Sequence, residues 1–168
     1  MNGKMEINSE INSEIILHVS RILVLLSFFS NQRTVKTTLD KIMLFDFYMK
    51  YPSIMIDDEK LTQAFSFYDY YSYFHWKPDR EEYQKYLRYL MAKRLISREI
   101  SSNEFIYSIT ANGIQITAEM TSSYSQSLKT VAAYIKKNIA KLSDTKIETD
   151  IISKSLYQKH QKAEGITL

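Results

Sequence analysis

The sequence of 168 residues contains no cysteine. This excludes a disulfide framework, a thiol nucleophile, a thiolate zinc site and a cysteine-bound iron–sulfur cluster. Its three glycines, Gly3, Gly113 and Gly165, lie far apart. A phosphate-binding loop needs clustered glycines so that backbone amides can approach the phosphates. Walker-type NTPases and Rossmann-type dinucleotide-binding proteins are therefore excluded.

The sequence also has few histidines and only a small net charge. The three histidines, His18, His75 and His160, include no pair one helical turn apart, so the sequence predicts no metal site. The net charge of +3 is well short of that of a protein that binds nucleic acid by charge alone. We interpret the acidic pairs 57–58 and 81–82 as a solvated loop and a helix N-terminus. We expect no enzymatic activity, no cofactor and no small-molecule substrate.

The chain has no long uninterrupted hydrophobic run. The apolar stretch Ile15–Phe29 contains His18 and Arg21, and an acidic, polar segment precedes it. These features predict a core helix and not a signal peptide or a membrane span. With no export signal and no cysteine, the expected compartment is the cytoplasm.

Hydrophobic residues make up 45% of the chain, enough to bury one core. Apolar spacing predicts helices over 11–29, from Thr37 or Thr38 to Lys50, and from Asp79 onwards. Two β-prone runs, 95–100 and 105–109, predict a hairpin. We expect a mainly α, winged helix-turn-helix-like domain of three helices and a β-hairpin wing, followed by a long C-terminal helix.

The predicted organisation has four parts: a flexible N-terminus (1–10), a winged-helix-like domain (11–120), a C-terminal helix (121–142) and a polar, lysine-rich tail (143–168). Thr110 and Ser122 are placed to begin the last two helices. Leucine, valine and isoleucine recur along the C-terminal helix at intervals of three and four. Part of this stripe must cover the domain, and we expect the remainder, including Ile135 and Ile139, to accept a partner.

Residues 65–76 are unusually aromatic, with eight aromatic side chains in twelve positions. Three interpretations stay open: core filling, a protein interface, or a platform for stacked bases. No arginine or lysine lies between Lys60 and Lys77, which weakens the third. The candidate partner contacts in this stretch are Tyr70, Tyr71, Tyr73 and Trp76.

The third helix carries the candidate DNA contacts. Arg80, Lys85 and Arg88 lie on its polar side, and Arg98 lies in the hairpin that follows. A recognition helix needs such groups to reach base edges or phosphates. Glu81 and Glu82 at its start would repel phosphates.

Several segments resemble a known family. They are Arg21-Ile-Leu-Val-Leu-Leu, then Leu44-Phe-Asp-Phe-Tyr with Asp46 at the acidic position, Phe74-His-Trp-Lys-Pro-Asp-Arg with His75 and Arg80 at matching places, and Ser122-Ser-Tyr-Ser-Gln-Ser-Leu. In order and spacing they resemble the middle component of bacterial ABC-three-component systems, which include the Lamassu anti-phage systems. The chain departs from the family pattern in that no proline directly follows His75.

The resemblance implies a small non-enzymatic subunit of an antiviral defence complex. Such a subunit would tie an SMC-like ATPase, which senses DNA, to an effector that is often a nuclease, and would help to hold that effector inactive. DNA contact would then occur through the complex, with no role at a membrane. The alternative is a winged-helix transcriptional regulator that binds DNA as a homodimer through its C-terminal helix.

Overall fold

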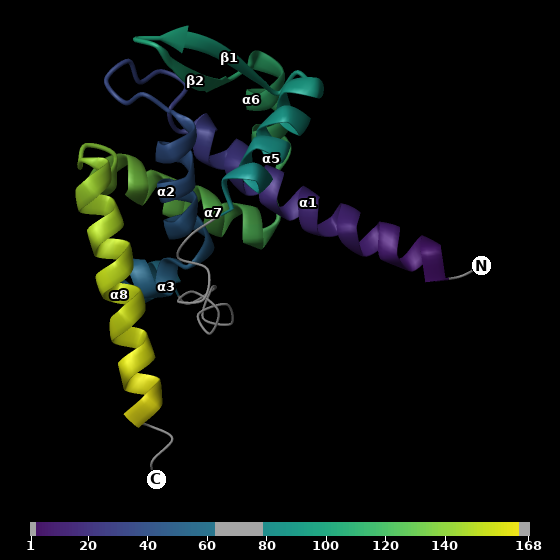
Figure 1. The fold of residues 1–168 in the computed structure, drawn as a ribbon. Helices are drawn as coiled ribbons and strands as arrows, with labels where there is room; N and C mark the ends of the chain where they lie inside the picture. The colour runs from purple at the N-terminus through teal and green to yellow at the C-terminus, as the bar shows by residue number, and fades with distance from the viewer. Residues whose placement is uncertain (1–2, 63–78, 165–168) are drawn as a thin grey trace.

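The computed structural model describes the backbone of residues 3–62 and 79–164, and the side chains of residues 13–61 and 79–155. Within these ranges the chain is mainly helical with one antiparallel hairpin (Figure 1). The elements in order are α1 (Gly3–Ser27), α2 (Leu39–Lys50), α3 (Pro52–Met55), α4 (Glu59–Thr62), α5 (Arg80–Ala92), β1 (Ile96–Ser101), β2 (Glu104–Ile109), α6 (Ala111–Glu119), α7 (Ser123–Tyr134), the π-helical turn η2 (Ile135–Ile139) and α8 (Asp144–Glu164). The predicted fold class, helices with a hairpin, is confirmed.

Several helices begin at a side chain that accepts a hydrogen bond from the first turn. Such caps satisfy backbone N–H groups that have no partner within the helix. The expected caps Thr110 and Ser122 are confirmed, and Thr38 and Asp79 cap α2 and α5. Short-range chemistry therefore sets most of the element boundaries.

The hairpin pairs Ile96 with Ile109 at its base and Ser101 with Glu104 at its tip. Its two turn residues, Ser102 and Asn103, both have positive φ, 52° and 65°. Positive φ at both positions is typical of the type I′ turn, whose twist matches that of the strands. The backbone N–H of Tyr107 donates to the Thr37 carbonyl at 3.0 Å, and the Thr37 hydroxyl donates to the Tyr107 carbonyl at 2.5 Å. These two bonds fasten the hairpin to the start of α2.

Two hydrophobic cores share α1 and α2. The first core joins one face of these helices to α5 and the base of the hairpin. The second core joins their other face to α3, α7, η2 and α8. Because α1 and α2 are covered on two sides, they carry apolar residues around most of their circumference. The hairpin therefore lies at one end of the molecule and α8 beside α3 at the other (Figure 1).

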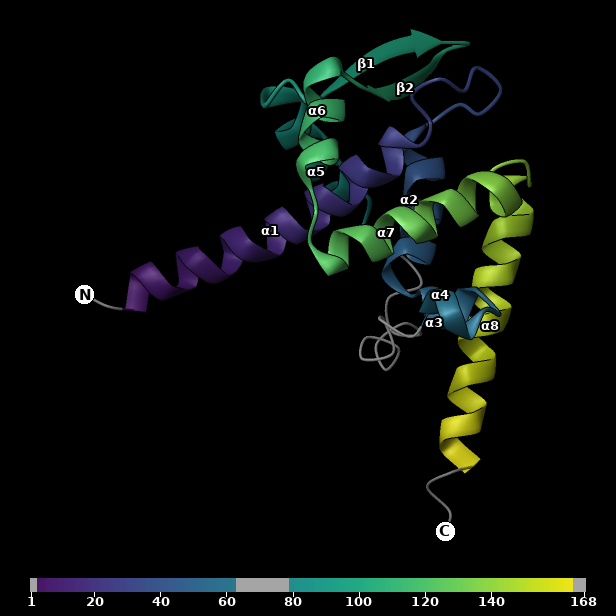
Figure 2. The same cartoon turned by 180° about the vertical axis from the view of Figure 1, so that it is seen from behind.

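The two termini project away from this body. The first half of α1 extends to one side, and α8 runs past α3 in another direction (Figures 1 and 2). Helix α1 begins at Gly3 and so includes most of the segment 1–10, whose flexibility stays a prediction. A helix gains one hydrogen bond for each residue added, and it extends without a packed face. None of the described helices is long and apolar enough to cross a membrane.

Residues 144–164 of the expected polar tail form α8. Ile147 and Ile151, one helical turn apart, are buried in the second core. The Lys154 ammonium donates to the Met55 carbonyl at 2.8 Å, and Lys41 forms an ion pair with Asp144. Two isoleucines in a polar sequence give only a weak helical periodicity, but both pack α8 into the second core.

Candidate functional site

A buried ion pair joins the first two helices at the centre of the molecule. Arg21 of α1 donates from Nε to Asp46 Oδ1 at 2.6 Å and from Nη2 to Oδ2 at 2.8 Å. The Tyr83 hydroxyl of α5 donates to the same Oδ2 at 2.5 Å. Arg21 is 4% exposed and Asp46 is fully buried. Three helices are thus tied together by one carboxylate.

The charges of this cluster are held in place by their partners. Burial penalises the Asp46 carboxylate, but the facing guanidinium and the hydrogen bonds from Arg21 and Tyr83 outweigh it, so the pKa of Asp46 is lowered. Burial likewise opposes the charge on Arg21, and the Asp46 carboxylate more than offsets it, so the pKa of Arg21 is raised. Burial, and then the Asp46 charge, raise the pKa of Tyr83 well above its usual value. Tyr83 therefore stays protonated and donates.

His18 extends the cluster towards the surface. The Arg21 Nη2 lies 2.8 Å from His18 Nδ1, and a guanidinium only donates, so Nδ1 accepts and the proton lies on Nε2. The imidazole stacks on Tyr86, with ring centroids 4.9 Å apart and planes 10° apart. Burial, and then the charges of Arg21 and Lys50, lower the pKa of His18 to about 4. His18 is therefore neutral at pH 7.

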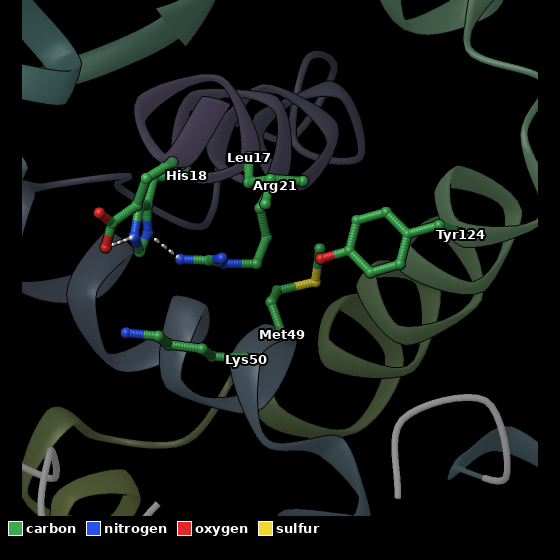
Figure 3. Close-up of a pocket in the computed structure, with 7 residues that line it drawn as sticks. Leu17, His18, Arg21, Met49, Lys50 and Tyr124 are labelled. Atoms are coloured by element: carbon green, nitrogen blue, oxygen red, sulfur yellow. Dashed lines mark hydrogen bonds and ion pairs between the residues drawn. The ribbon is translucent and has the colours of Figure 1, made fainter. Parts of the chain in front are cut away.

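A pocket of about 280 Å³ opens beside this cluster. It lies where α1 meets the end of α2 and the start of α7 (Figure 3). Leu17, Met49 and the ring of Tyr124 supply apolar walls, and Lys50 lies below the His18–Arg21 pair. The lining residues are Glu14, Leu17, His18, Arg21, Met49, Lys50 and Tyr124.

The cluster is suited to holding helices together and poorly suited to acid–base chemistry. Both oxygens of Asp46 already accept hydrogen bonds, and the carboxylate has no exposed surface. A general base must reach the proton that it removes, which Asp46 cannot do from this position. Among the described residues no group of three histidine, aspartate or glutamate side chains is placed to hold a metal ion.

Comparison with known families identifies the chain. The family model described as ABC-three component (ABC-3C) system Middle Component 2 matches residues 10–162. The chain belongs to this family. The resemblance to middle components is thereby confirmed. No curated protein and no solved structure matches the chain.

The buried pair unites two of the segments that carried the resemblance to the middle-component family. Arg21 opens the apolar run of α1, and Asp46 is the acidic residue of the motif in α2. Neither was among the candidate site residues. The available signal was one charged residue within the apolar run of each helix, Arg21 in α1 and Asp46 in α2, because buried charged residues are nearly always paired. Which charged residues pair with each other depends on how the helices pack, and the spacing of residues along the sequence does not predict that packing.

The expected aromatic contacts of the middle component lie outside the described residues. Tyr70, Tyr71, Tyr73 and Trp76 fall within 63–78, as does His75. Their assignment to an interface stays a prediction. The acidic loop before them follows its expected character, since Asp57 is exposed and lies 3.4 Å from the Lys154 ammonium.

Ile135 and Ile139 are not available to a partner in this fold. They are 0% and 7% exposed and lie in the second core of the middle component itself. Leu128 and Val131 of the same stripe are buried there too. The expectation that the stripe covers the domain holds, but the partner-binding role of Ile135 and Ile139 is wrong. The reason is that α8, expected as a tail, packs into the same core and leaves no free face.

The four candidate DNA contacts lie on exposed surface but differ in their partners. Arg80 forms an ion pair with Asp40 on α2, and Arg88 Nε donates to the Gln84 carbonyl at 3.2 Å. The Arg98 guanidinium lies over the Phe105 ring, 4.2 Å from its centroid. Lys85 is exposed on α5. The structure contains no nucleic acid, so their role in DNA binding stays a prediction.

Proposed function

We propose that this middle component is a non-catalytic adaptor of an SMC-like ATPase defence complex of the Lamassu type. It would link the ATPase to an effector, often a nuclease, and restrain the effector until the ATPase senses DNA. The single observation that carries the proposal is the match to the middle-component family over residues 10–162. The cytoplasm is the compartment in which such a complex would act.

The cluster at the centre of the fold supports a structural role. Arg21, Asp46 and Tyr83 satisfy one another and fix three helices, which suits a rigid scaffold. A rigid adaptor presents its docking surfaces in a constant relative geometry and loses little entropy on binding. The residues of the cluster are thus better placed to fix the relative positions of docking surfaces than to act on a substrate.

The transcriptional-regulator alternative has less support. The first turn of α5 carries Glu81 and Glu82, and Arg80 is already paired with Asp40. At the hairpin tip Ile100 is 71% exposed, and its cross-strand neighbour Phe105 is also exposed. Phosphate contact favours cations and hydrogen-bond donors at such positions. An apolar tip is more typical of contact with protein.

Reconstitution with the other two components of the system tests the adaptor function. Tagged middle component should co-purify with the ATPase and with the effector, and its omission should separate those two from each other. The isolated chain should show no nuclease or ATPase activity. Its specific, tight binding to one DNA sequence, together with independent association of the ATPase and the effector, would contradict the proposal.

Replacing Lys85 and Arg88 together by glutamate separates the two uses of α5. Both side chains are exposed, so the free energy of unfolding should change little. If they contact phosphates within the complex, DNA affinity should fall and its salt dependence should weaken by about one unit of slope for each lost contact. If DNA binding is unchanged, α5 contributes to the hydrophobic core of the adaptor and not to DNA binding.

A further inference from the structure

We propose that the pocket between α1, α2 and α7 is a docking site for an apolar side chain and a neighbouring carboxylate of another component of the system. The inference rests on the proposed adaptor function and names the partner chemistry that one of its surfaces would recognise. The occupant is a segment of a partner polypeptide that carries both groups.

The apolar half of the pocket is lined by exposed side chains. Leu17 is 49% exposed and Tyr124 is 39% exposed, and both line it together with the buried Met49 (Figure 3). Exposed aliphatic and aromatic side chains around a concave site favour contact with protein. The volume of about 280 Å³ lies below the range of roughly 300–1,000 Å³ that is typical of small-molecule sites. It suits an inserted side chain better than a cofactor.

In the polar half of the pocket, Lys50 and the exposed Glu14 do not form an ion pair with each other. Arg21 is neutralised by Asp46, and His18 is neutral, with its Nε2 3.8 Å from Glu14 Oε1. Among the described side chains no carboxylate lies within 4.0 Å of the Lys50 ammonium, whose recorded contact is the Tyr51 ring at 5.7 Å. Lys50 is nevertheless partly buried.

An incoming carboxylate would form an ion pair with Lys50. Burial, and then the charge of Arg21, lower the pKa of Lys50, while Asp46, Glu82 and Glu14 act on it only from a distance. A partly buried cation is costly unless an anion pairs with it at close range. A partner carboxylate next to Lys50 would supply that anion. The bound partner would also shield the ion pair from water.

The surroundings favour a polypeptide as the carrier of that carboxylate. Exposed Ile16 adjoins Leu17, and the first half of α1 projects beyond the body next to the pocket (Figures 1 and 2). A chain docked in the pocket can therefore continue along α1 and gain contact area. A small carboxylate would fill the pocket and leave this surface uncovered.

The first test is photo-crosslinking in the reconstituted three-component complex. Leu17 is replaced by p-benzoylphenylalanine, with the exposed Thr149 on α8 as the control position. The expected result is a crosslink from position 17 to the ATPase or the effector, on a peptide with an aspartate or glutamate beside the crosslinked residue. A crosslink to a second copy of this chain, or none in an assembled complex, would overturn the proposal.

The second test changes the charge at Lys50. Lys50→Glu should weaken assembly about tenfold or more, and Lys50→Arg should retain it, because the attraction depends on the positive charge. Lys137→Glu, at an exposed lysine on η2, is the matched control and should assemble normally. Thermal melting of each free chain shows whether the variants fold. Should Lys50→Glu destabilise the fold, Leu17→Asp provides the same test from an exposed position.

The outcomes separate this inference from the adaptor function. If the wild-type chain fails to assemble with either component, the adaptor function is wrong and the docking site fails with it. If the wild-type chain assembles and the folded Lys50→Glu and Leu17→Asp variants assemble equally well, the adaptor function stands and the docking site is wrong.

Discussion

At the scale of single residues, the Arg21–Asp46 pair is buried, with Arg21 4% exposed and Asp46 fully buried. Removing one member of such a pair leaves an uncompensated buried charge, which is far more costly than losing an ion pair at the surface. The chain offers a matched surface pair, Arg80 with Asp40, which also joins two helices but whose side chains are more than half exposed. Comparing the two pairs isolates the effect of burial.

We expect Arg21→Met to lower the free energy of unfolding by about 3–5 kcal/mol. Arg80→Met should cost less than about 1 kcal/mol, because exposed pairs are screened by water. The double variant Arg21→Met with Asp46→Leu should cost less than the sum of its parts, since no charge is then left unpaired. Urea unfolding followed by circular dichroism measures these three variants and Asp46→Leu alone. Equal losses for Arg21→Met and Arg80→Met would contradict the structural role of the buried pair.

His18 makes stability depend on pH above the range where carboxylates titrate. Its pKa is about 4 in the folded chain, against about 6.5 in an unfolded one. Between these values the unfolded chain binds more protons, so the free energy of unfolding falls as the pH falls. We expect a loss of about 1–2 kcal/mol from pH 7 to pH 5. The lowered pKa of Asp46 places its own contribution at lower pH, where it is lost on further acidification.

The control for this effect is His18→Asn. The amide oxygen of asparagine can still accept from Arg21 near the place of Nδ1, but it does not titrate. Denaturant unfolding at several pH values should therefore show a shallower pH dependence for the variant than for the wild type. Parallel curves for the two chains would assign the pH dependence to other groups.

At the scale of elements, α5 ends in a Schellman motif with an unusual residue. The Leu95 N–H donates to the Leu90 carbonyl at 3.0 Å, and the Arg94 N–H donates to the Met91 carbonyl at 2.9 Å. This motif places a residue of positive φ after the helix, and glycine is the usual choice. Here Arg94 takes the position with a φ of 56°. A side chain in this conformation costs roughly 1–2 kcal/mol, a cost that glycine does not incur.

We therefore expect Arg94→Gly to raise the free energy of unfolding by about 0.5–1 kcal/mol, after the greater freedom of glycine in the unfolded chain is subtracted. Arg94→Ala is the control, because it removes the guanidinium and keeps the Cβ atom that causes the strain. Chemical denaturation should rank glycine above arginine, with alanine no more stable than arginine. A stabilising Arg94→Ala would instead point to charge repulsion as the cause.

Elements were predictable where local chemistry defines them, and not where packing does. Thr110 and Ser122 cap helices because a hydroxyl beside a free N–H needs no distant partner. The hairpin followed from two β-prone runs and a polar turn. The pairing of Arg21 with Asp46 and the pocket beside them depend on how α1, α2 and α7 meet, and spacing along the chain carries no such information.

At the scale of the whole molecule, the second core changes how the C-terminal third should be understood. Residues 123–139 pack against α1 and α2, and α8 then packs against α2 and α3. The segment from α7 to α8 is thus part of the fold and not an arm that seeks a partner. The candidate surfaces for the other components are therefore the pocket beside α1, the apolar hairpin tip at Ile100 and Phe105, and the aromatic stretch 65–76.

The last prediction tests whether α8 belongs to the core. Ile147→Ala removes a fully buried side chain and should lower the free energy of unfolding by about 2–4 kcal/mol, through lost burial and the cavity left behind. Thr149→Ala, exposed on the same helix, is the control and should change it by less than about 0.5 kcal/mol. Denaturant unfolding of both variants measures the difference. Because α8 shares its core with α1 and α2, the Ile147→Ala chain should still unfold in one cooperative transition, shifted to lower denaturant. If α8 were an independent tail, the two variants would unfold together with the wild type.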